Sequence, residues 1–264
     1  MAKAKVVASN LGAPPSLDWI PLERLTIDSR YQRALGNKNE RHVRRIVAHF
    51  SWNRYQPIVV TESGDKFAVI DGQHRLAAAV LHPKIDSLPC YVVDAPTVAD
   101  QAAIFIAANT DRIALGRIHQ FWAAHAAGTE WAVRIHKLCE GAGVEISRTP
   151  RSNLPPLTTV ATFTIQKLFP LGDNAIASAL ALLVESHGDT ADVFRSATIA
   201  ALARIAAEQD FDFAGMVKVL RDLDLTEQLA RAKAKKATGG GKLEVALEEI
   251  LRKRYARRNG AGRR

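Results

Sequence analysis

Residues 69–79 join a β-type run directly to an alanine-rich, helix-type run through Gly72. The run before the glycine is apolar and β-branched, and the run after it is rich in strong helix formers. Glycine adopts backbone angles that are closed to other residues, and the first N–H groups of a helix attract anions at its positive dipole end. With His74 and Arg75 in the first helical turn, the junction predicts a phosphate-holding turn between a strand and a helix.

Plainer interpretations of this junction stay open. Asp71-Gly72 is a common turn dipeptide, and His74 and Arg75 would then be solvent-facing residues of an ordinary first turn. Asp71 is either a turn former or a group that helps to position Mg²⁺ or water. The sequence contains neither a glycine-rich loop ending in Lys-Ser/Thr nor a Gly-x-Gly-x-x-Gly fingerprint.

Several motifs, taken in order, resemble the ParB N-terminal/sulfiredoxin-like superfamily over residues 19–121. Tyr31-Gln32-Arg33 follows a short strand-like run and is similar to the first box of that superfamily. Residues 56–60, Gln-Pro-Ile-Val-Val, are similar to one of its strand motifs. Residues 71–75 stand where ParB proteins have Gly-Glu-Arg-Arg and sulfiredoxins have Gly-Cys-His-Arg, and residues 108–112 stand where ParB proteins have Glu-Asn-x-x-Arg.

The resemblance implies a nucleotide-binding α+β domain in a phage or mobile-element relative of ParB. It implies that a nucleoside triphosphate, CTP or ATP, is held by residues of these boxes, and it leaves a role for Mg²⁺ and a homodimer open. The implied nucleotide- or phosphate-binding residues are Gln32, Arg33, Asp71, Gly72, Gln73, His74, Arg75, Asn109 and Arg112.

Three positions depart from the patterns of the superfamily. Gln73 stands where sulfiredoxins have their cysteine, which excludes their reduction of a cysteine sulfinic acid. Ala108 replaces the ParB glutamate associated with magnesium, and His74 replaces the first arginine of the ParB box. A DNA clamp driven by CTP therefore does not follow from the resemblance.

Composition favours a soluble protein of the cytoplasm. The chain has 264 residues, of which 47% are hydrophobic, enough to bury one or two cores. Cys90 and Cys139 have neither zinc-site spacing nor a disulfide framework, so both are expected to be buried thiols. No apolar run approaches the roughly 20 residues that span a bilayer, and no signal-peptide core is visible at the N-terminus. No membrane association is expected.

The positive charge is concentrated near the C-terminus. Residues 231–264 carry 12 Lys and Arg against 3 Glu, a balance of +9 that equals the formal net charge of the whole chain. Such a segment either attracts DNA without reading its sequence or serves as a solvated end that keeps the protein soluble. The residues expected to contact DNA non-specifically are Arg252, Lys253, Arg254, Arg257 and Arg258.

The pattern of elements predicts an α+β domain followed by an all-helical domain. The expected organisation is a loose arm (1–16), the ParB/sulfiredoxin-like domain (17–127), a connecting helix (128–148), a linker (149–157), a helical domain (158–237) and a basic tail with a helix (238–264). Strands are expected at 18–22, 57–61, 66–70 and 88–93, and helices at 40–51, 74–81, from Thr97 to about Asn109, and at 158–169, 173–186, 190–208, 211–220 and 225–237.

Residues 118–127 and 130–140 form a helix–glycine turn–helix pattern. As a DNA-reading unit, it would expose Trp131, Arg134 and Lys137. As a plain two-helix hairpin, which we favour, it would bury Trp131 and its apolar neighbours. The histidines of this region are six and eleven residues apart, which does not place two imidazoles on one helix face for a metal.

Three classes of function remain. The first, which we favour, is a nucleotide-binding, DNA-associated accessory protein of a phage, plasmid or other mobile element. The second is an enzyme that uses the same site, either a metal-dependent nuclease or a nucleoside triphosphatase. The third is a protein-binding scaffold with a remnant site. The first is favoured because anion-binding residues are present, whereas the extra carboxylates of a two-metal nuclease are not visible.

Overall fold

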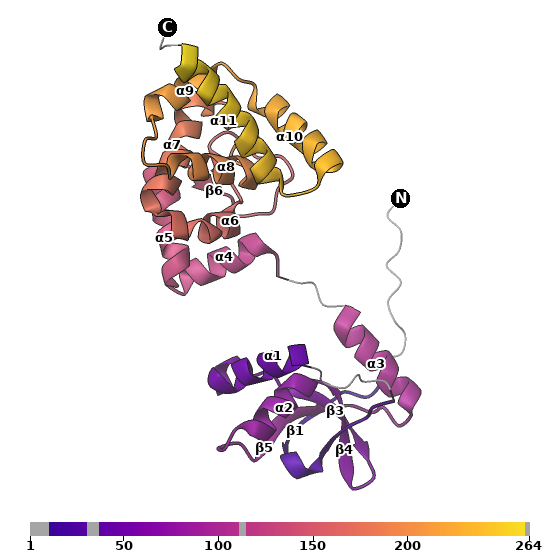
Figure 1. Ribbon diagram of the computed structural model, residues 1–264. Coiled ribbons are helices and arrows are strands. Elements are labelled where there is room, and N and C mark those ends of the chain that lie inside the picture. Colours follow the sequence, from indigo (N-terminus) through magenta and orange to yellow (C-terminus); the bar gives the residue numbers. More distant parts are fainter. Residues whose placement is uncertain (1–10, 31–36, 111–114, 262–264) are drawn as a thin grey trace, which may run out of the picture. The chain divides into compact units, whose positions relative to one another are not determined.

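The computed structural model describes residues 11–30, 37–110 and 115–261 of the chain. Contacts separate two compact units, residues 1–113 and residues 114–264 (Figure 1). The described part of the first unit combines a mixed β-sheet with helices, whereas the second unit is helical apart from a pair of two-residue strands. The protein is an α+β domain followed by a helical domain, which confirms the predicted fold class.

The sheet of the first unit has the strand order β1-β5-β3-β4-β2. Strand β1 pairs with β5, and β3 with β4, in antiparallel orientation. Strand β3 pairs with β5, and β2 with β4, in parallel orientation. The strands are β1 (Ser16–Pro21), β2 (Leu25–Ile27), β3 (Ile58–Ser63), β4 (Lys66–Asp71) and β5 (Ser87–Val92). Only β2 was not expected, because three residues are too short to show a hydrophobic period.

The core of this unit lies between the sheet and α2 (Gln73–Leu81). Alternate side chains of the strands point to this core, as the twofold period of a strand requires. Its buried members are Ile20, Leu25, Ile58, Val60, Val69, Leu76, Ala79, Leu88 and Cys90. Helix α1 (Asn37–Ala48) lies beside α2, and α3 (Val98–Thr110) contacts β4 (Figure 1). Single-turn 3-10 helices η1 (Leu22–Arg24) and η2 (Trp52–Arg54) complete the described elements of the unit.

Two helices of this unit show local features that their sequences encode. Thr97 and Asp100 form a capping box at the start of α3, with the Thr97 N–H donating to Asp100 Oδ2 (3.2 Å) and the Asp100 N–H donating to Thr97 Oγ1 (3.2 Å). In α1, Val43 is buried, while Arg41, Arg44 and Arg45 are exposed. The helix is therefore amphipathic as its pattern indicates, with a strongly basic outer surface.

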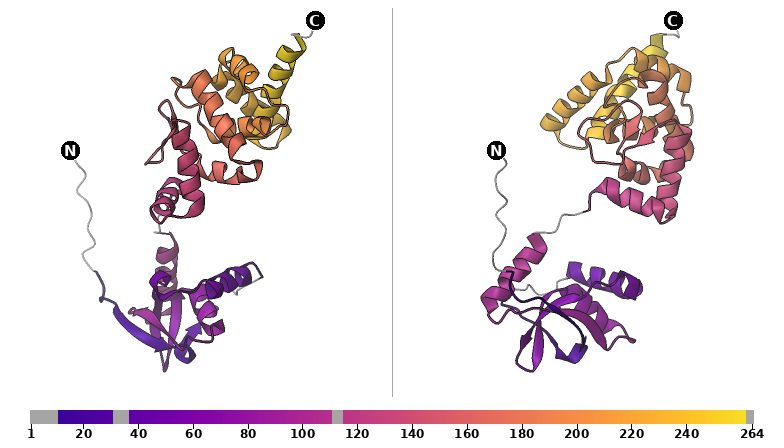
Figure 2. Two further views of the ribbon diagram at one scale, coloured as in Figure 1. Left: turned by 90° about the vertical axis from the view of Figure 1, so that its left-hand side faces the viewer. Right: turned by 180° about the vertical axis from the view of Figure 1, so that it is seen from behind.

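The second unit is built around α7 and α8, whose apolar side chains are mostly buried. Its helices are α4 (Arg117–Ala126), α5 (Glu130–Gly141), α6 (Thr162–Lys167), α7 (Asp173–His187), α8 (Ser196–Ala206), α9 (Phe213–Arg221), α10 (Leu225–Gly239) and α11 (Leu243–Ala261), with a 3-10 turn η3 (Phe169–Leu171). The yellow C-terminal helix α11 lies against the other helices in both views of Figure 2, and it contacts α8, α9 and α10.

Three expected helix bounds in this unit were wrong. Thr158–Thr159 form strand β7, paired with β6 (Glu145–Ile146), so α6 begins only at Thr162. Helix α8 begins at Ser196 rather than at 190, because Asp192 has a positive φ of 64° and cannot continue a helix. Helix α10 continues to Gly239, two residues beyond its expected end at 237, and the turn that follows lies at Gly240 and Gly241, which both have positive φ.

The segment 149–157, expected to be a linker, lies inside the second unit. Leu154 is buried, its N–H donates to Asp192 Oδ1 (2.7 Å), and the Asp192 N–H donates to Leu154 O (3.0 Å). The hairpin α4–α5 also belongs to this unit, since Phe121 and Ile135 are buried in its core. The contacts thus divide the chain between residues 113 and 114, rather than at the expected boundaries of 127 and 149.

Two of the hairpin's candidate DNA readers are engaged in packing. Trp131 contacts the rings of Phe121 and Phe163. The Arg134 guanidinium lies 4.0 Å from the centre of the Phe169 ring and pairs with Asp173 at 2.7 Å. Lys137 is exposed. The contacts of Trp131 and Arg134 support the interpretation of α4–α5 as a structural hairpin.

Both cysteines are buried, and we expect them to be unreactive in the folded protein. Burial raises the pKa of the Cys90 and Cys139 thiols to about 12, so the reactive thiolate is scarce at pH 8. Treatment with a thiol reagent such as iodoacetamide at pH 8 should leave both residues unmodified, as read by mass spectrometry, and unfolding in guanidinium should expose both. Rapid alkylation of either residue under native conditions would contradict its burial.

No helix in the described ranges has the length and apolar character that a membrane span requires.

Candidate functional site

The candidate site is the turn that joins β4 to α2. Asp71 ends β4, and Gly72, with φ +106° and ψ +19°, precedes the first residue of α2. Asp71 pairs with Val59 and Val69 pairs with Val60, so β4 accommodates one extra residue just before the turn. Such β-bulges bend a strand and redirect the chain that follows it. The predicted strand–glycine–helix junction is therefore present, with a bulge that the sequence did not reveal.

Position 72 requires a glycine, both because of its backbone angles and because of the atoms around it. A Cβ atom at this position would lie 2.3 Å from Ile58 Cγ2 and 3.1 Å from Arg75 Nη2. Ile58 is fully buried, so it has little room to move. The glycine lets the backbone pass directly over β3 and brings the start of α2 to the end of the sheet.

Arg75 ties the turn to the segment that leads into β3. Its Nη1 donates to Gln56 O (2.6 Å) and Pro57 O (2.8 Å), and its Nη2 donates to Asp71 Oδ2 (3.0 Å). The Arg75 and Asp71 side chains are only 19% and 15% exposed. Three of the five guanidinium donors are thus used inside the protein. Arg75 therefore braces the turn, a role that the sequence did not predict.

The turn opens into a cavity of about 400 Å³, here called the turn cavity. It is lined by His42, Ile46, Ile70, Asp71, Gly72, Gln73, His74, Arg75, Phe105 and Asn109. Six of the nine residues implied by the resemblance therefore lie around one cavity, although Asn109 follows Arg75 by 34 positions in the sequence. The other three, Gln32, Arg33 and Arg112, lie outside the described residues.

Asn109 reaches the cavity from α3, whose contact with β4 places it beside the turn. Its side-chain Nδ2 donates to Phe105 O (2.7 Å) of the same helix. The amide is therefore oriented by its own helix at the wall of the cavity. The amide nitrogen carries two hydrogens, so a ligand could accept the second while the first stays bonded to the Phe105 carbonyl.

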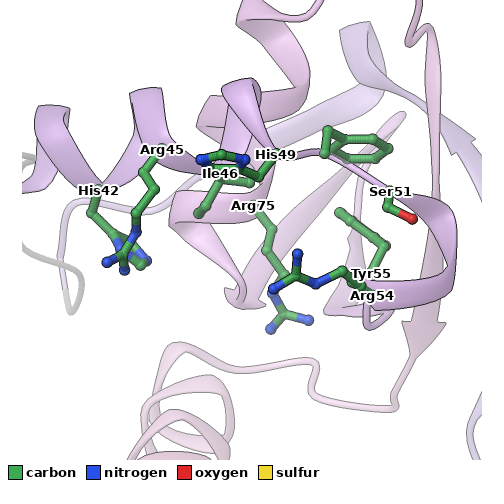
Figure 3. A pocket seen from close by; sticks show the side chains of 9 residues that line it. His42, Arg45, Ile46, His49, Ser51, Arg54, Tyr55 and Arg75 are labelled. Carbon is green, nitrogen blue, oxygen red and sulfur yellow. The ribbon is translucent and has the colours of Figure 1, made fainter. Parts of the chain in front are cut away.

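A second cavity of about 570 Å³, here called the arginine cavity, adjoins the first (Figure 3). The two cavities share His42, Ile46 and Arg75 as lining residues. The lining residues of the arginine cavity are His42, Arg45, Ile46, His49, Phe50, Ser51, Arg54, Tyr55 and Arg75. They come from α1, the segment after it and the first turn of α2, and Figure 3 shows Arg54 and Arg75 side by side.

Electrostatics favours an anion in this region. No carboxylate is among the described residues that line the arginine cavity, and the one that lines the turn cavity, Asp71, is paired with Arg75. His42 lies between the two cavities, with its Nδ1 3.0 Å from Arg45 Nη2 and its ring 5.2 Å from that of His74. Across the described residues, no group of three His, Cys, Asp or Glu side chains is placed to hold a metal ion.

The cationic wall from α1 was not among the predicted site residues. His42, Arg45 and His49 recur at i, i+3 and i+7, which places them on one helix face. This spacing is visible in the sequence, but a charged helix face is also what ordinary solvent exposure produces. Only the packing of α1 beside α2 reveals that the face borders the Gly72 turn.

The predicted DNA-contacting residues lie on α11 and differ in their surroundings. Arg252 is paired with Glu208 and with Glu248 (2.8 Å). Lys253 and Arg254 are exposed. The side chains of Arg257 and Arg258 lie outside the described residues. The charge available to a partner in the described part of this helix is therefore lower than the sequence count suggests.

Residues 27–261 match the family of unknown function DUF6551, and the chain belongs to this family. No curated protein is similar enough to match. Among solved structures, the chain is similar to C-terminally truncated chromosome-partitioning protein ParB from Caulobacter crescentus complexed with CTP-γ-S, with 16% identity, 78% of this chain and 98% of that chain covered, and a TM-score of 0.37. The same protein complexed to the centromeric parS site gives 16% identity, coverage of 89% and 99%, and a TM-score of 0.31.

Proposed function

We propose that this member of the DUF6551 family binds a nucleotide through its phosphates at the turn cavity and acts as a DNA-associated accessory protein. The observation that carries the proposal is the meeting of the 71–75 turn and Asn109 around one cavity. The start of a helix of nine residues faces this site, and the adjoining wall is cationic. Following the sequence resemblance, we place the protein in a phage, plasmid or other mobile element.

A nucleoside triphosphate, CTP or ATP, is the ligand that best suits the two cavities. Cavities of 300 to 1,000 Å³ are typical of small-molecule sites, and both of these fall in that range. Arg45 and Arg54 supply permanent positive charge at the arginine cavity, which adjoins the turn cavity. Several phosphates would thus find compensating charge without a metal ion, so we propose that Mg²⁺ has only a small effect on binding.

The proposal is for binding and not for hydrolysis. A nuclease or triphosphatase of the metal-dependent type needs carboxylates that hold a divalent cation near the reacting phosphate. Asp71 is the described carboxylate nearest to the turn, and Arg75 already neutralises it. Ala108, at the position of the ParB glutamate, offers no ligand atom in its side chain.

We predict that His74→Ala and Asn109→Ala each weaken binding of CTP or ATP about tenfold, because each removes a donor to a charged phosphate worth about 1.5 kcal/mol. Isothermal titration calorimetry with and without Mg²⁺ measures the effect. Arg75→Ala should also weaken binding, but it breaks three internal hydrogen bonds as well and is less informative.

Thr110→Ala is the matched control for Asn109→Ala. Thr110 is exposed on the same helix and does not line either cavity, so its loss should leave affinity within twofold of the wild type. Absence of nucleotide binding by the wild-type protein would refute the proposed ligand. Rapid hydrolysis that both His74→Ala and Asn109→Ala abolish would replace the binding role with an enzymatic one.

We propose that contact with duplex DNA is made by the exposed cations of α11, among them Lys253 and Arg254. The double variant Lys253→Glu/Arg254→Glu should weaken non-specific duplex binding and flatten its salt dependence, since each phosphate neutralised contributes about 0.9 to the slope of log affinity against log salt. Fluorescence anisotropy over a salt series measures this. Lys167→Glu/Lys218→Glu, at exposed positions of α6 and α9, is the charge-matched control, and equal losses in both variants would rule out a specific role for α11.

A further inference from the structure

The charge of the first unit is divided unequally along the chain. Residues 37–54, which form α1 and η2, contain five Lys and Arg against one Glu. The remaining described residues of this unit, 11–30 and 55–110, contain five Lys and Arg against nine Asp and Glu. One short segment is thus strongly basic on a domain that is otherwise acidic, and such a patch attracts a polyanion.

The basic segment leads directly into a cluster of aromatic side chains. Trp52 follows α1, and its ring lies 4.9 Å from the Phe50 ring, 5.6 Å from the Tyr55 ring and 5.3 Å from the Trp19 ring. Phe50 and Tyr55 line the arginine cavity, so the cluster begins at the wall that holds Arg45 and Arg54. Cationic and aromatic side chains therefore form one continuous surface, here called the α1 strip.

The outer members of the aromatic cluster are exposed. Trp19 and Trp52 keep 61% and 48% of their surface accessible, although each is large and apolar. Trp52 meets Trp19 and Phe50 in edge-type contacts rather than in parallel stacks. Exposed tryptophans beside arginines are costly for a surface with no partner, and they provide π-faces on which a planar group can stack.

We infer that the α1 strip is a binding surface for single-stranded nucleic acid. The phosphates of the strand would lie along Arg45 and Arg54, and an unpaired base would stack on Trp52. A positively charged groove combined with stacking aromatic side chains is the recurring solution for binding single strands. Duplex DNA fits less well, because its bases are already stacked on one another and cannot reach a side chain without unpairing.

This surface overlaps the ligand site of the proposed function at the arginine cavity, where Arg45 and Arg54 lie. It uses the outer wall of the arginine cavity and the tryptophans beyond it, and it requires no nucleotide at the Gly72 turn. It also differs from the duplex contact proposed for α11, which lies in the other unit. Trp52 lines neither cavity, so the effect of Trp52→Leu on single-strand binding tests this inference apart from nucleotide binding.

The test is fluorescence anisotropy of the full-length protein with a labelled 20-nucleotide oligo-dT and with a duplex of the same length. Arg45→Glu and Arg54→Glu should each weaken single-strand binding at least fivefold and lower the slope of log affinity against log salt by about 0.7 for each phosphate that is no longer neutralised. Trp52→Leu, which keeps an apolar side chain but has no π-face, should weaken it at least fivefold with little change in the salt slope.

Lys66→Glu is the matched control, since it makes the same charge change at an exposed position of the same unit, in β4. It should leave single-strand affinity within twofold of the wild type. An equal loss in Lys66→Glu and Arg45→Glu, or unchanged binding in Arg54→Glu, overturns the inference. So does tighter binding of the duplex with no effect of Trp52→Leu, which would make the strip a surface for double-stranded phosphate. Far-UV circular dichroism verifies that each variant is folded.

Discussion

Replacing Gly72 by alanine should destabilise the first unit by about 2 to 5 kcal/mol and abolish ligand binding at the turn. A residue with a Cβ at φ +106° loses about 1 to 2 kcal/mol from backbone strain alone. The added atom would also lie 2.3 Å from Ile58 Cγ2, and forcing extra volume into a packed core typically costs about 1 to 3 kcal/mol more. Against a typical total stability of about 5 to 15 kcal/mol, this loss is large.

Gly64→Ala separates the two contributions. Gly64, in the turn between β3 and β4, also has a positive φ (+66°), but no atom lies within 4 Å of the Cβ that alanine would add. It should therefore show only the backbone strain of about 1 to 2 kcal/mol. Hydrogen exchange read by mass spectrometry assigns each loss to peptides of the first unit, which matters because the two units can unfold separately. Equal effects of the two substitutions would mean that Ile58 yields without cost.

The same packing explains why the turn was predictable from sequence and its brace was not. Strand propensity, a glycine and a run of alanines are local signals, and they predict the β4–Gly72–α2 junction correctly. The partners of Arg75 are carbonyl oxygens 18 and 19 residues earlier, at Pro57 and Gln56. Every residue type has a backbone carbonyl, so the sequence does not show where such acceptors will lie. An arginine that stabilises a turn therefore cannot be distinguished, from sequence alone, from one that binds a ligand.

Long-range pairing limited the prediction elsewhere in a similar way. Leu25–Ile27 becomes strand β2 only because it pairs with Phe67–Val69 of β4. The segment 149–157, with three prolines among nine residues, has the composition of a linker, yet Leu154 is buried and hydrogen-bonded to Asp192, 38 residues later. Composition describes what a segment prefers in isolation, whereas tertiary contacts decided these two cases.

The candidate site, too, was predictable where the sequence carries a motif and not predictable where tertiary packing decides. Motif order along the chain indicated that Asn109 would join residues 71–75, and the structure places it at the same cavity. The cationic wall from α1 was not inferred, although its helical spacing is regular. Amphipathic patterns say which face of a helix is polar, and only tertiary packing says what that face borders.

Removing α11 should unfold much of the second unit. Leu247 and Leu251 are both fully buried in the core that α7 and α8 also form, and α11 contacts α8, α9 and α10. Deletion of residues 242–264 would expose this surface to water at a cost of roughly 25 cal/mol for each Å² of apolar area. We expect a strong fall in the thermal midpoint, loss of helical circular dichroism and aggregation.

Point variants show whether the loss of stability on deletion of α11 comes from its buried leucines or from its charges. Leu247→Ala and Leu251→Ala should each cost about 2 to 5 kcal/mol, the range for deleting a buried leucine side chain. Val245→Ala, on the same helix but 41% exposed, should cost well under 1.5 kcal/mol. If all three variants unfold at the same urea concentration as the wild type, α11 does not contribute to the core.

This result determines how the basic C-terminal segment has to be tested. A truncation that abolishes DNA binding would be uninformative, since the loss of Leu247 and Leu251 removes a structural helix along with its cations. The ion pairs of Arg252 with Glu208 and Glu248 add to this difficulty, because removing Arg252 also removes contacts within the folded unit. Charge substitutions at exposed positions such as Lys253 and Arg254 leave the buried face of α11 intact. They should reduce duplex binding with no shift in the thermal midpoint, whereas a midpoint that falls together with affinity would show that these cations act through the fold.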